Sequence, residues 1–384
     1  MWRFVGAVVG LGIVVVLGFS LIDPPGGGDV QASALLTITD RDNSGFERAV
    51  APRDWDFPAD HGPHPQFQTE WWYYTGNLSD PAGRRFGFQF TIFRRAISPS
   101  SYESDSEWRA DQIYLGHLSL TDVADDAYYH DQRLSRGSAG LAGATIDPRY
   151  RVWLESWQVI GQDENATRTA ITATSGAFAL DLHLEQIKPP ALQGDRGLSA
   201  KSGDPGNASH YYSLSRLLTD GSVTVGGQTY SVSGTTWMDH EFSTSALGND
   251  ALGWDWFGLH LDDERDLMLG QIRRVDGGKE PAFGGLLVMP DGDTQLLTAS
   301  DITIEALDSW TSPHSGATYP AGWQIRVDNG DEPLDLTIRP LVADQELYDA
   351  GIVYWEGAVS IDGDTTGYGY AELTGYADSM TGRF

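Results

Sequence analysis

Cysteine is absent from this chain of 384 residues, and basic residues are scarce. Without cysteine there is no disulfide framework, no thiolate metal site and no cysteine nucleophile. The 25 Lys and Arg residues face 54 Asp and Glu residues, which gives a formal net charge of -29. Such a charge repels nucleic acid and anionic lipid headgroups, so nucleic acid is excluded as a partner. The acidic residues are spread along the chain, which indicates a role in solubility rather than a docking patch.

The motifs of several enzyme classes are also missing. The chain contains no Gly-x-Ser-x-Gly nucleophile elbow, no phosphate-binding loop and no dinucleotide fingerprint. His61 and His64 stand in a proline-rich loop, where we expect both side chains to be solvated rather than bound to a metal. The acidic residues 262–264 lack the spacing of a calcium loop. We therefore predict neither a metal nor a cofactor.

The N-terminus carries the longest apolar run. Residues 4–22 are uncharged and rich in Val, Leu and Gly, and a run of roughly 19 apolar residues can span a membrane. Small residues at 30–34 offer a site for signal cleavage. Residues 1–22 are thus predicted to be either a signal peptide or a single-pass membrane anchor. Both alternatives place the body outside the cytoplasm, either periplasmic or attached to the cytoplasmic membrane.

The body of the chain follows a linker predicted at residues 23–46, and its pattern is typical of β-structure. Short runs of β-branched and aromatic residues alternate with Gly, Asp, Asn and Pro turns, and no long helical period occurs. We expect strands at 70–78, 86–94, 113–121, 177–185, 222–232 and 334–339. The pattern favours an all-β protein made of twisted sheets or barrels.

A break rich in Ser, Thr, Gly and Asn at residues 242–250 divides this body. The two domains predicted from it, 47–242 and 243–384, are each long enough for a barrel of about eight to ten short strands.

Rings and ionisable groups alternate most closely at residues 237–245. In a strand, side chains alternate between the two faces, so Asp239 and Glu241 lie opposite His240 and cannot share a site with it.

The same alternation at residues 253–261 places Trp254 and Trp256 on one face and Asp255 on the other. Polar groups among large rings are typical of the wall of an apolar ligand pocket. They also occur on a wet surface strand beside a packed core, and the pattern alone leaves both alternatives open.

Six motifs, in order through both halves, resemble those of a known family: 70–78 (EWWYYTGNL), 86–94 (FGFQFTIFR), 210–217 (HYYSLSRL), 237–245 (WMDHEFSTS), 354–359 (YWEGAV) and 369–376 (GYAELTGY). They are similar to carotenoid 1,2-hydratase (hydroxyneurosporene synthase) and the AttH proteins, from about Phe57 to the end. The resemblance implies a calycin fold of two consecutive lipocalin-like antiparallel β-barrel domains, with a cavity between or within them. In that family one branch hydrates acyclic carotenoids without a cofactor, AttH-type members accompany transporter genes, and related fungal proteins act as pericyclases on polyenes.

The hydratase pattern of the family is only partly present. It uses a His-x-Trp and, some two dozen residues later, a Tyr-x-Asp; here His240 matches, Phe242 replaces the Trp, and residues 262–268 contain no Tyr-x-Asp. This departure shifts the resemblance toward the AttH-type members.

The candidate catalytic residues are His240, Asp255, Asp239 and Glu241. His240 is either an acid catalyst or a satisfied core histidine. Asp239 and Glu241 either form a paired-carboxylate site or bond to loop backbone. Asp255 stands between two tryptophans and is the best substitute proton donor if it faces a cavity, because burying it is otherwise costly.

Three glutamates also have two interpretations each. Glu70 is either a buried acid with a raised pKa or the exposed start of a strand. Glu356 and Glu372, in strands rich in Gly and Tyr, are expected to bond tyrosine hydroxyls or close a barrel end.

Seven rings are candidates for ligand binding: Trp72, Tyr74, Trp254, Trp256, Phe242, Tyr354 and Trp355. Rings of this kind line lipocalin-like cavities and also fill cores.

The function we expect is binding or handling of a hydrophobic, lipid- or isoprenoid-like ligand at the outer side of the cytoplasmic membrane, with an ABC-type export system as a partner. The alternative is a cofactor-independent enzyme of the carotenoid 1,2-hydratase or pericyclase type that acts on a polyene. An enzyme needs an ionisable group inside the cavity beside the rings, whereas a carrier needs only shape and apolar walls.

Overall fold

The computed structural model describes residues 43–99, 106–245, 247–248, 250–328, 330, 332–348 and 351–380. The predicted signal peptide or anchor at 1–22, and most of the predicted linker at 23–46, lie outside the described residues. Within the described ranges, no helix is both long enough and apolar enough to cross a membrane.

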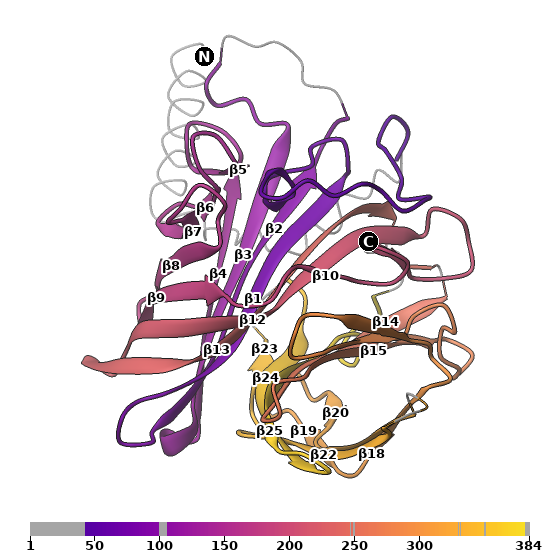
Figure 1. Ribbon diagram of the computed structural model, residues 1–384. Helices are drawn as coiled ribbons and strands as arrows, with labels where there is room; N and C mark the ends of the chain where they lie inside the picture. Colours follow the sequence, from indigo (N-terminus) through magenta and orange to yellow (C-terminus); the bar gives the residue numbers. More distant parts are fainter. Residues whose placement is uncertain are drawn as a thin grey trace, which may run out of the picture.

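The prediction of an all-β protein is confirmed. The described helices are two short 3-10 turns, η1 (Ala59–His61) and η2 (Val123–Asp125), and the strands form two large antiparallel sheets, each curled into a nearly closed barrel (Figure 1).

The first barrel has the strand order β4-β3-β2-β1-β13-β12-β9-β8-β7-β6-β5, and β10 and β11 also pair with β12. Its strands are β1 (Thr69–Ser79), β2 (Arg85–Ala96), β3 (Gln112–Asp122), β4 (Ala127–Arg136), β5 (Ala142–Thr145), β6 (Arg151–Leu154), β7 (Trp157–Gly161), β8 (Arg168–Thr174), β9 (Phe178–Gln186), β10 (Ala191–Leu192), β11 (Leu198–Ala200), β12 (Ala208–Val225) and β13 (Gln228–Ser245).

The second barrel has the order β17-β16-β15-β14-β25-β24-β22-β21-β18, with β23 paired to β24, and β19 and β20 form a separate pair. Its strands are β14 (Ala251–Leu261), β15 (Asp266–Arg274), β16 (Gly285–Val288), β17 (Thr294–Leu297), β18 (Ile302–Ala306), β19 (Ser309–Thr311), β20 (Thr318–Pro320), β21 (Trp323–Val327), β22 (Leu334–Pro340), β23 (Glu346–Leu347), β24 (Tyr354–Gly363) and β25 (Gly367–Leu373).

Alternate residues of the strands fill the two barrel interiors. On β2, Phe86, Phe88 and Phe90 are fully buried in the core of the first barrel. On β14, Phe257 and Leu259 are fully buried in the core of the second. The period of two seen in the sequence therefore marks the interior face of each strand.

The single strand expected at residues 222–232 is wrong. β12 ends at Val225, β13 begins at Gln228, and Gly226 and Gly227 form the turn of a hairpin between them. Both glycines have a positive φ, 58° and 78°, which other residues seldom adopt. A two-residue turn with φ > 0 at both positions suits the twist of a hairpin.

The two barrels pack against each other through outer faces of their strands. Tyr73, Tyr211 and Trp237 of the first barrel form a cluster with Trp256 and Tyr370 of the second. A Cβ atom on Gly87 of β2 would lie 2.5 Å from the Cβ of Ala358 on β24, so the absence of a side chain permits this close approach.

Candidate functional site

Strand β13 carries two separate polar sites on its opposite faces, as the alternation predicted. Asp239 and Glu241 point to the space between the barrels, where they line a pocket. His240 points into the interior of the first barrel and bonds to Glu70.

The first site is a pocket of about 110 Å³ between the two barrels. Side chains from both barrels line it, and most of them are rings or aliphatic groups: Trp71, Tyr73, Phe93, His117, Lys201, Tyr211, Asp239, Glu241, Leu247, Trp254, Trp256, Ile272, Phe283, Ile352, Tyr354, Glu372, Thr374 and Met380. A concave, ring-lined space with a few polar groups is the usual form of a small-molecule site.

Asp239 is held rigidly in the wall of this pocket. Its carboxyl accepts hydrogen bonds from the Tyr211 hydroxyl (2.7 Å), the Ser213 hydroxyl (2.5 Å) and the Trp237 indole N–H (2.7 Å). Burial raises the pKa of Asp239 to about 7, although these three donors favour the ionised form. The predicted alternative of hydrogen bonding to loop backbone is therefore not what the side chain does.

Glu241 has a cationic partner. The Nζ atom of Lys201 lies 2.8 Å from its Oε1 atom, and both side chains are buried. The same ammonium group lies 4.6 Å from the ring centre of Phe283 and 5.1 Å from that of Tyr211. A cation therefore already rests on two ring faces in this pocket.

Glu356 and Glu372 are directly opposite each other in the ladder between β24 and β25. Burial, reinforced by the neighbouring Glu372, raises the pKa of Glu356 well above its usual range. Burial also raises the pKa of Glu372 to about 8, and the nearby charges of Asp239 and Glu241 add to the shift. Like charges packed this closely do not ionise together.

His117 is a pocket residue that sequence reasoning missed. Its Nε2 donates to the Oε1 atom of Gln132 (3.1 Å), so its Nδ1 is free to accept from the Tyr354 hydroxyl at 2.7 Å. Burial lowers the pKa of His117 to about 4, so the ring is neutral at pH 7. In the sequence, His117 stands out only because histidine is rare in this chain. The sequence does not show which face of β3 meets the second barrel.

The seven candidate rings are divided among four places. Trp254, Trp256 and Tyr354 line the pocket between the barrels. Trp72 and Tyr74 belong to the core of the first barrel and Trp355 to the core of the second, while Phe242 stacks on His64 with ring centres 3.6 Å apart.

Asp255 lies outside the residues that line the pocket. Its Oδ1 accepts from Arg273 Nε (3.1 Å) and from the Tyr376 hydroxyl (3.1 Å), and its Oδ2 accepts from Gln271 Nε2 (2.6 Å). The charge of this buried carboxylate is thus compensated by an ion pair, and the condition for a proton donor, exposure to the cavity, is not met.

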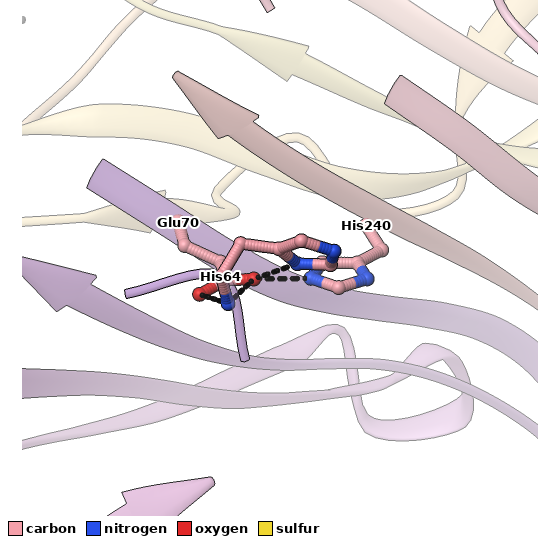
Figure 2. A group of neighbouring side chains, drawn as sticks. All are labelled: His64, Glu70 and His240. Carbon is pink, nitrogen blue, oxygen red and sulfur yellow. Dashed lines mark hydrogen bonds and ion pairs between the residues drawn. The ribbon is translucent and has the colours of Figure 1, made fainter. Parts of the chain in front are cut away.

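The second site is a fully enclosed cluster at one end of the first barrel. Figure 2 shows His64 and His240 converging on the carboxylate of Glu70, whose Oε1 lies 2.8 Å from His64 Nδ1 and 2.9 Å from His240 Nε2. Oε2 accepts from Arg94 Nε at 2.8 Å. Glu70, Arg94 and His240 are all 0% exposed.

Charge compensation decides the protonation of this cluster. Burial opposes ionisation of Glu70, yet the Arg94 guanidinium holds the pKa of Glu70 well below its usual range. Glu70 is therefore the buried acid of the two predicted alternatives, but its pKa is lowered instead of raised. Burial lowers the pKa of His240, while hydrogen bonds to Asp60 and Glu70 raise the pKa of His64 against the effect of burial.

The expectation that His61 and His64 are solvated is wrong. They are 4% and 6% exposed, because their loop folds over the end of the barrel. His64 Nε2 lies 3.1 Å from Asp60 Oδ1, and His61 Nδ1 lies 2.7 Å from the Tyr212 hydroxyl. Ring nitrogens of His64 and His240 and a Glu70 oxygen lie within 4.8 Å of one another, a spacing that could hold a metal ion. Arg94 already supplies the positive charge that Glu70 needs, so the cluster is balanced by protein groups.

Comparisons with known proteins agree with this fold. The family model described as AttH-like matches residues 48–376. The crystal structure of an AttH candidate protein from Nitrosomonas europaea is 34% identical, with a TM-score of 0.76 over 86% of this chain and 100% of that chain. No curated protein matches the sequence.

Two further crystal structures share the fold at low identity. Kievitone hydratase from Nectria haematococca is 15% identical, with a TM-score of 0.64 over 88% of this chain and 97% of that chain. CghA, solved with Sch210972, is 11% identical, with a TM-score of 0.53 over 86% of this chain and 96% of that chain. At these identities the likeness shows the fold alone. The family model and the 34% identical structure, both spanning nearly the whole body, show that the chain belongs to the AttH-like family.

Proposed function

We propose that this chain binds a hydrophobic, lipid- or isoprenoid-like molecule in the pocket between its two barrels. The observation that supports this most is the lining, in which rings of both barrels enclose a space that the cores do not fill. Apolar walls favour an apolar body by removing it from water, and the few polar groups orient it.

The test is to extract the purified protein with organic solvent and analyse the extract by mass spectrometry. A bound lipid or polyene is expected, and its amount should fall in Trp254→Ala, which removes a ring of the pocket. Trp108→Ala removes a ring that is 65% exposed and should leave the amount unchanged. Repeatedly empty extracts, together with no binding of added prenyl alcohols, would overturn the proposal.

A specific observation favours the enzymatic alternative as well. Asp239 and Glu372, with pKa values raised by burial to about 7 and about 8, hold protons inside the pocket near neutral pH. An uncharged carboxyl carries a proton that can be delivered to an alkene, and the neighbouring rings stabilise the cation that results. No cofactor takes part in this chemistry.

His117 and Tyr354 complete a hydration step. The carboxyl proton of Glu372 or Asp239 adds to one alkene carbon, and a water oxygen forms the C–O bond at the other. The proton of that water passes to the Tyr354 oxygen as the Tyr354 proton moves to Nδ1 of His117, 2.7 Å away. The carboxylate and the imidazolium that result are returned to their starting forms by proton exchange with water.

This alternative is tested by incubating the protein with acyclic polyenes and measuring the addition of one water by mass spectrometry. Asp239→Asn and Glu372→Gln should reduce conversion at least tenfold while binding persists. Asp220→Asn, on the exposed side of β12, is the matched control and should convert as the unmodified protein does. Equal conversion by the two pocket variants would remove the enzymatic alternative.

We further propose that residues 4–22 carry the body across the cytoplasmic membrane, where it works with an ABC-type export system. A fusion of the chain to alkaline phosphatase should be active only with residues 1–22 present, and the membrane fraction should retain it if the segment is an anchor. Co-purification of transporter subunits tests the partner, and activity without residues 1–22 would contradict the localisation.

A further inference from the structure

The pocket between the barrels contains more carboxyl groups than cationic groups. Three carboxyl groups line it, those of Asp239, Glu241 and Glu372, and the lining includes one ammonium group, that of Lys201. Lys201 is paired with Glu241 at 2.8 Å. Among the described residues, neither Asp239 nor Glu372 has an ion-pair partner.

The pocket offers several aromatic rings to a ligand. Trp256 stands edge-on to Tyr73 with ring centres 5.3 Å apart, and Trp254 lines the same space. Lys201 already makes cation–π contacts in this pocket, since its ammonium group lies within 5.1 Å of the ring centres of Phe283 and Tyr211. Ring faces are electron-rich, so they attract ammonium groups, and desolvation strengthens the attraction.

We propose that the pocket selects a ligand that carries a positively charged amine or quaternary ammonium group on an apolar body. This inference rests on the pocket being a ligand site, as proposed above. Aromatic rings beside unpaired carboxyls are the recognition chemistry of organic cations. Where Asp239 and Glu372 are ionised, a carboxylate ligand would lose its hydration and face like charge, so it is disfavoured.

The selection depends on pH. Groups from five strands face the two acids. They are Tyr73 of β1, Tyr211 and Ser213 of β12, Trp237 and Glu241 of β13, Trp254 of β14, and Tyr354 and Glu356 of β24, besides the acids themselves. Asp239 and Glu372 are mostly uncharged below pH 7 and ionise as the pH rises through about 7 and about 8. A permanent cation is therefore bound more tightly at pH 9 than at pH 6, and an anion less tightly.

Three ligands of equal chain length test the inference: decyltrimethylammonium, decanol and decanoate, each below its micelle concentration. Binding to the full chain is measured by calorimetry and by tryptophan fluorescence at pH 6 and pH 9. We expect the ammonium compound to bind at least tenfold more tightly than decanoate at pH 9, with decanol between them. Equal or tighter binding of decanoate overturns the inference.

Two variants locate the effect. Asp239→Asn and Glu372→Gln should bring the affinity for the ammonium compound down toward that of decanol and leave decanol binding unchanged, whereas Asp220→Asn should change neither. Circular dichroism verifies that the variants fold, and the comparison of three ligands on the unmodified chain stands without them. Binding of decanol without any preference for charge overturns the inference alone, and failure of all three ligands to bind overturns the proposed function with it.

Discussion

Glu70 shows how one buried residue depends on its partners. Its carboxylate accepts from His64, His240 and Arg94, and Glu70 and Arg94 are fully buried. Removing one partner of a buried ion pair leaves the other charge uncompensated, which costs about 3–5 kcal/mol. We expect Glu70→Gln to lower the free energy of unfolding by roughly this amount in urea denaturation.

The pH dependence of that variant distinguishes lost charge from lost packing. The pKa of Glu70 is depressed in the folded state, so its contribution is present above its unfolded pKa and is lost as the pH falls. The difference between Glu70→Gln and the unmodified chain should therefore shrink toward low pH. Glu185→Gln, at an exposed position of β9, should follow the unmodified chain at every pH. A constant difference would contradict the ion-pair account.

Asp239 is predicted to behave with the opposite sign. Its pKa is raised from 3.8 to about 7 by burial, so the folded state holds the proton more tightly than the unfolded state does. Stability then falls as the pH rises from about 4 to about 7, and Asp239→Asn removes that fall. In thermal denaturation, the free energy of unfolding of Asp239→Asn relative to that of the unmodified chain should rise by roughly 2–4 kcal/mol between pH 5 and pH 8. A gap that does not change with pH would show that Asp239 ionises normally.

At the scale of single residues, the sequence predicts on which face of a strand a side chain lies, but not which residues it contacts. Alternation along β13 separates His240 from Asp239 and Glu241, because successive side chains point to opposite sides of any strand. The partners of His240 come from a distant loop and from β1, 170 residues away at Glu70. No local sequence pattern indicates a contact between residues so far apart in the chain, so the His64–Glu70–His240 cluster could not be predicted.

At the scale of elements, the hairpin of β12 and β13 shows which signals are read easily. Strands such as β1 and β2 are found within two residues of the expected ranges, because their alternating aromatic residues have clear turn residues on both sides. Residues 222–232 also look like one run of β-branched residues, and the pair Gly226-Gly227 inside it is the turn. A Gly-Gly pair within a strand pattern is therefore better interpreted as a hairpin.

Gly226 allows the backbone strain of this turn to be tested separately from packing. No atom lies within 4 Å of the place where a Cβ would stand at Gly226 or at Gly176, but only Gly226 has a positive φ. Gly226→Ala should therefore lower the free energy of unfolding by about 1–2 kcal/mol through backbone strain. Gly176→Ala is the matched control and should be neutral or slightly stabilising. Equal effects of the two substitutions in urea denaturation would contradict the assignment of strain to the turn.

At the scale of the whole molecule, the motif resemblance correctly predicts two lipocalin-like barrels, while the position of the pocket follows from their packing. A lipocalin-like domain is expected to hold its ligand inside the barrel. Here the interiors are filled by Phe86, Phe88, Phe257 and other buried residues, and the pocket is formed by outer faces. The outer face of a strand that is buried by another domain has the same composition as an inner face, so sequence alternation cannot distinguish them.

Asp266 holds these outer faces together. It lies on β15 of the second barrel, is fully buried, and pairs with Lys188 (2.8 Å) and Arg216 (2.7 Å), which follow β9 and lie on β12 of the first. Ser215 of β12 donates to the same carboxylate at 3.0 Å. The two barrels therefore share one buried anion, and each loses compensation for its charges when they separate.

Asp266→Asn is expected to uncouple the barrels. Buried Lys188 and half-buried Arg216 of the first barrel would lose their counter-charge, which costs about 3–5 kcal/mol. The loss weakens the interface between the barrels rather than either core. Unfolding should then separate into two transitions in calorimetry, because each barrel keeps its own core. Asp263→Asn, in the adjacent exposed loop and bonded to Arg265 of the same barrel, should leave the transitions coupled. Ligand binding in the pocket should also weaken in Asp266→Asn, since the walls of the pocket belong to different barrels. Unchanged binding together with a single unfolding transition would show that the pocket does not depend on this ion pair.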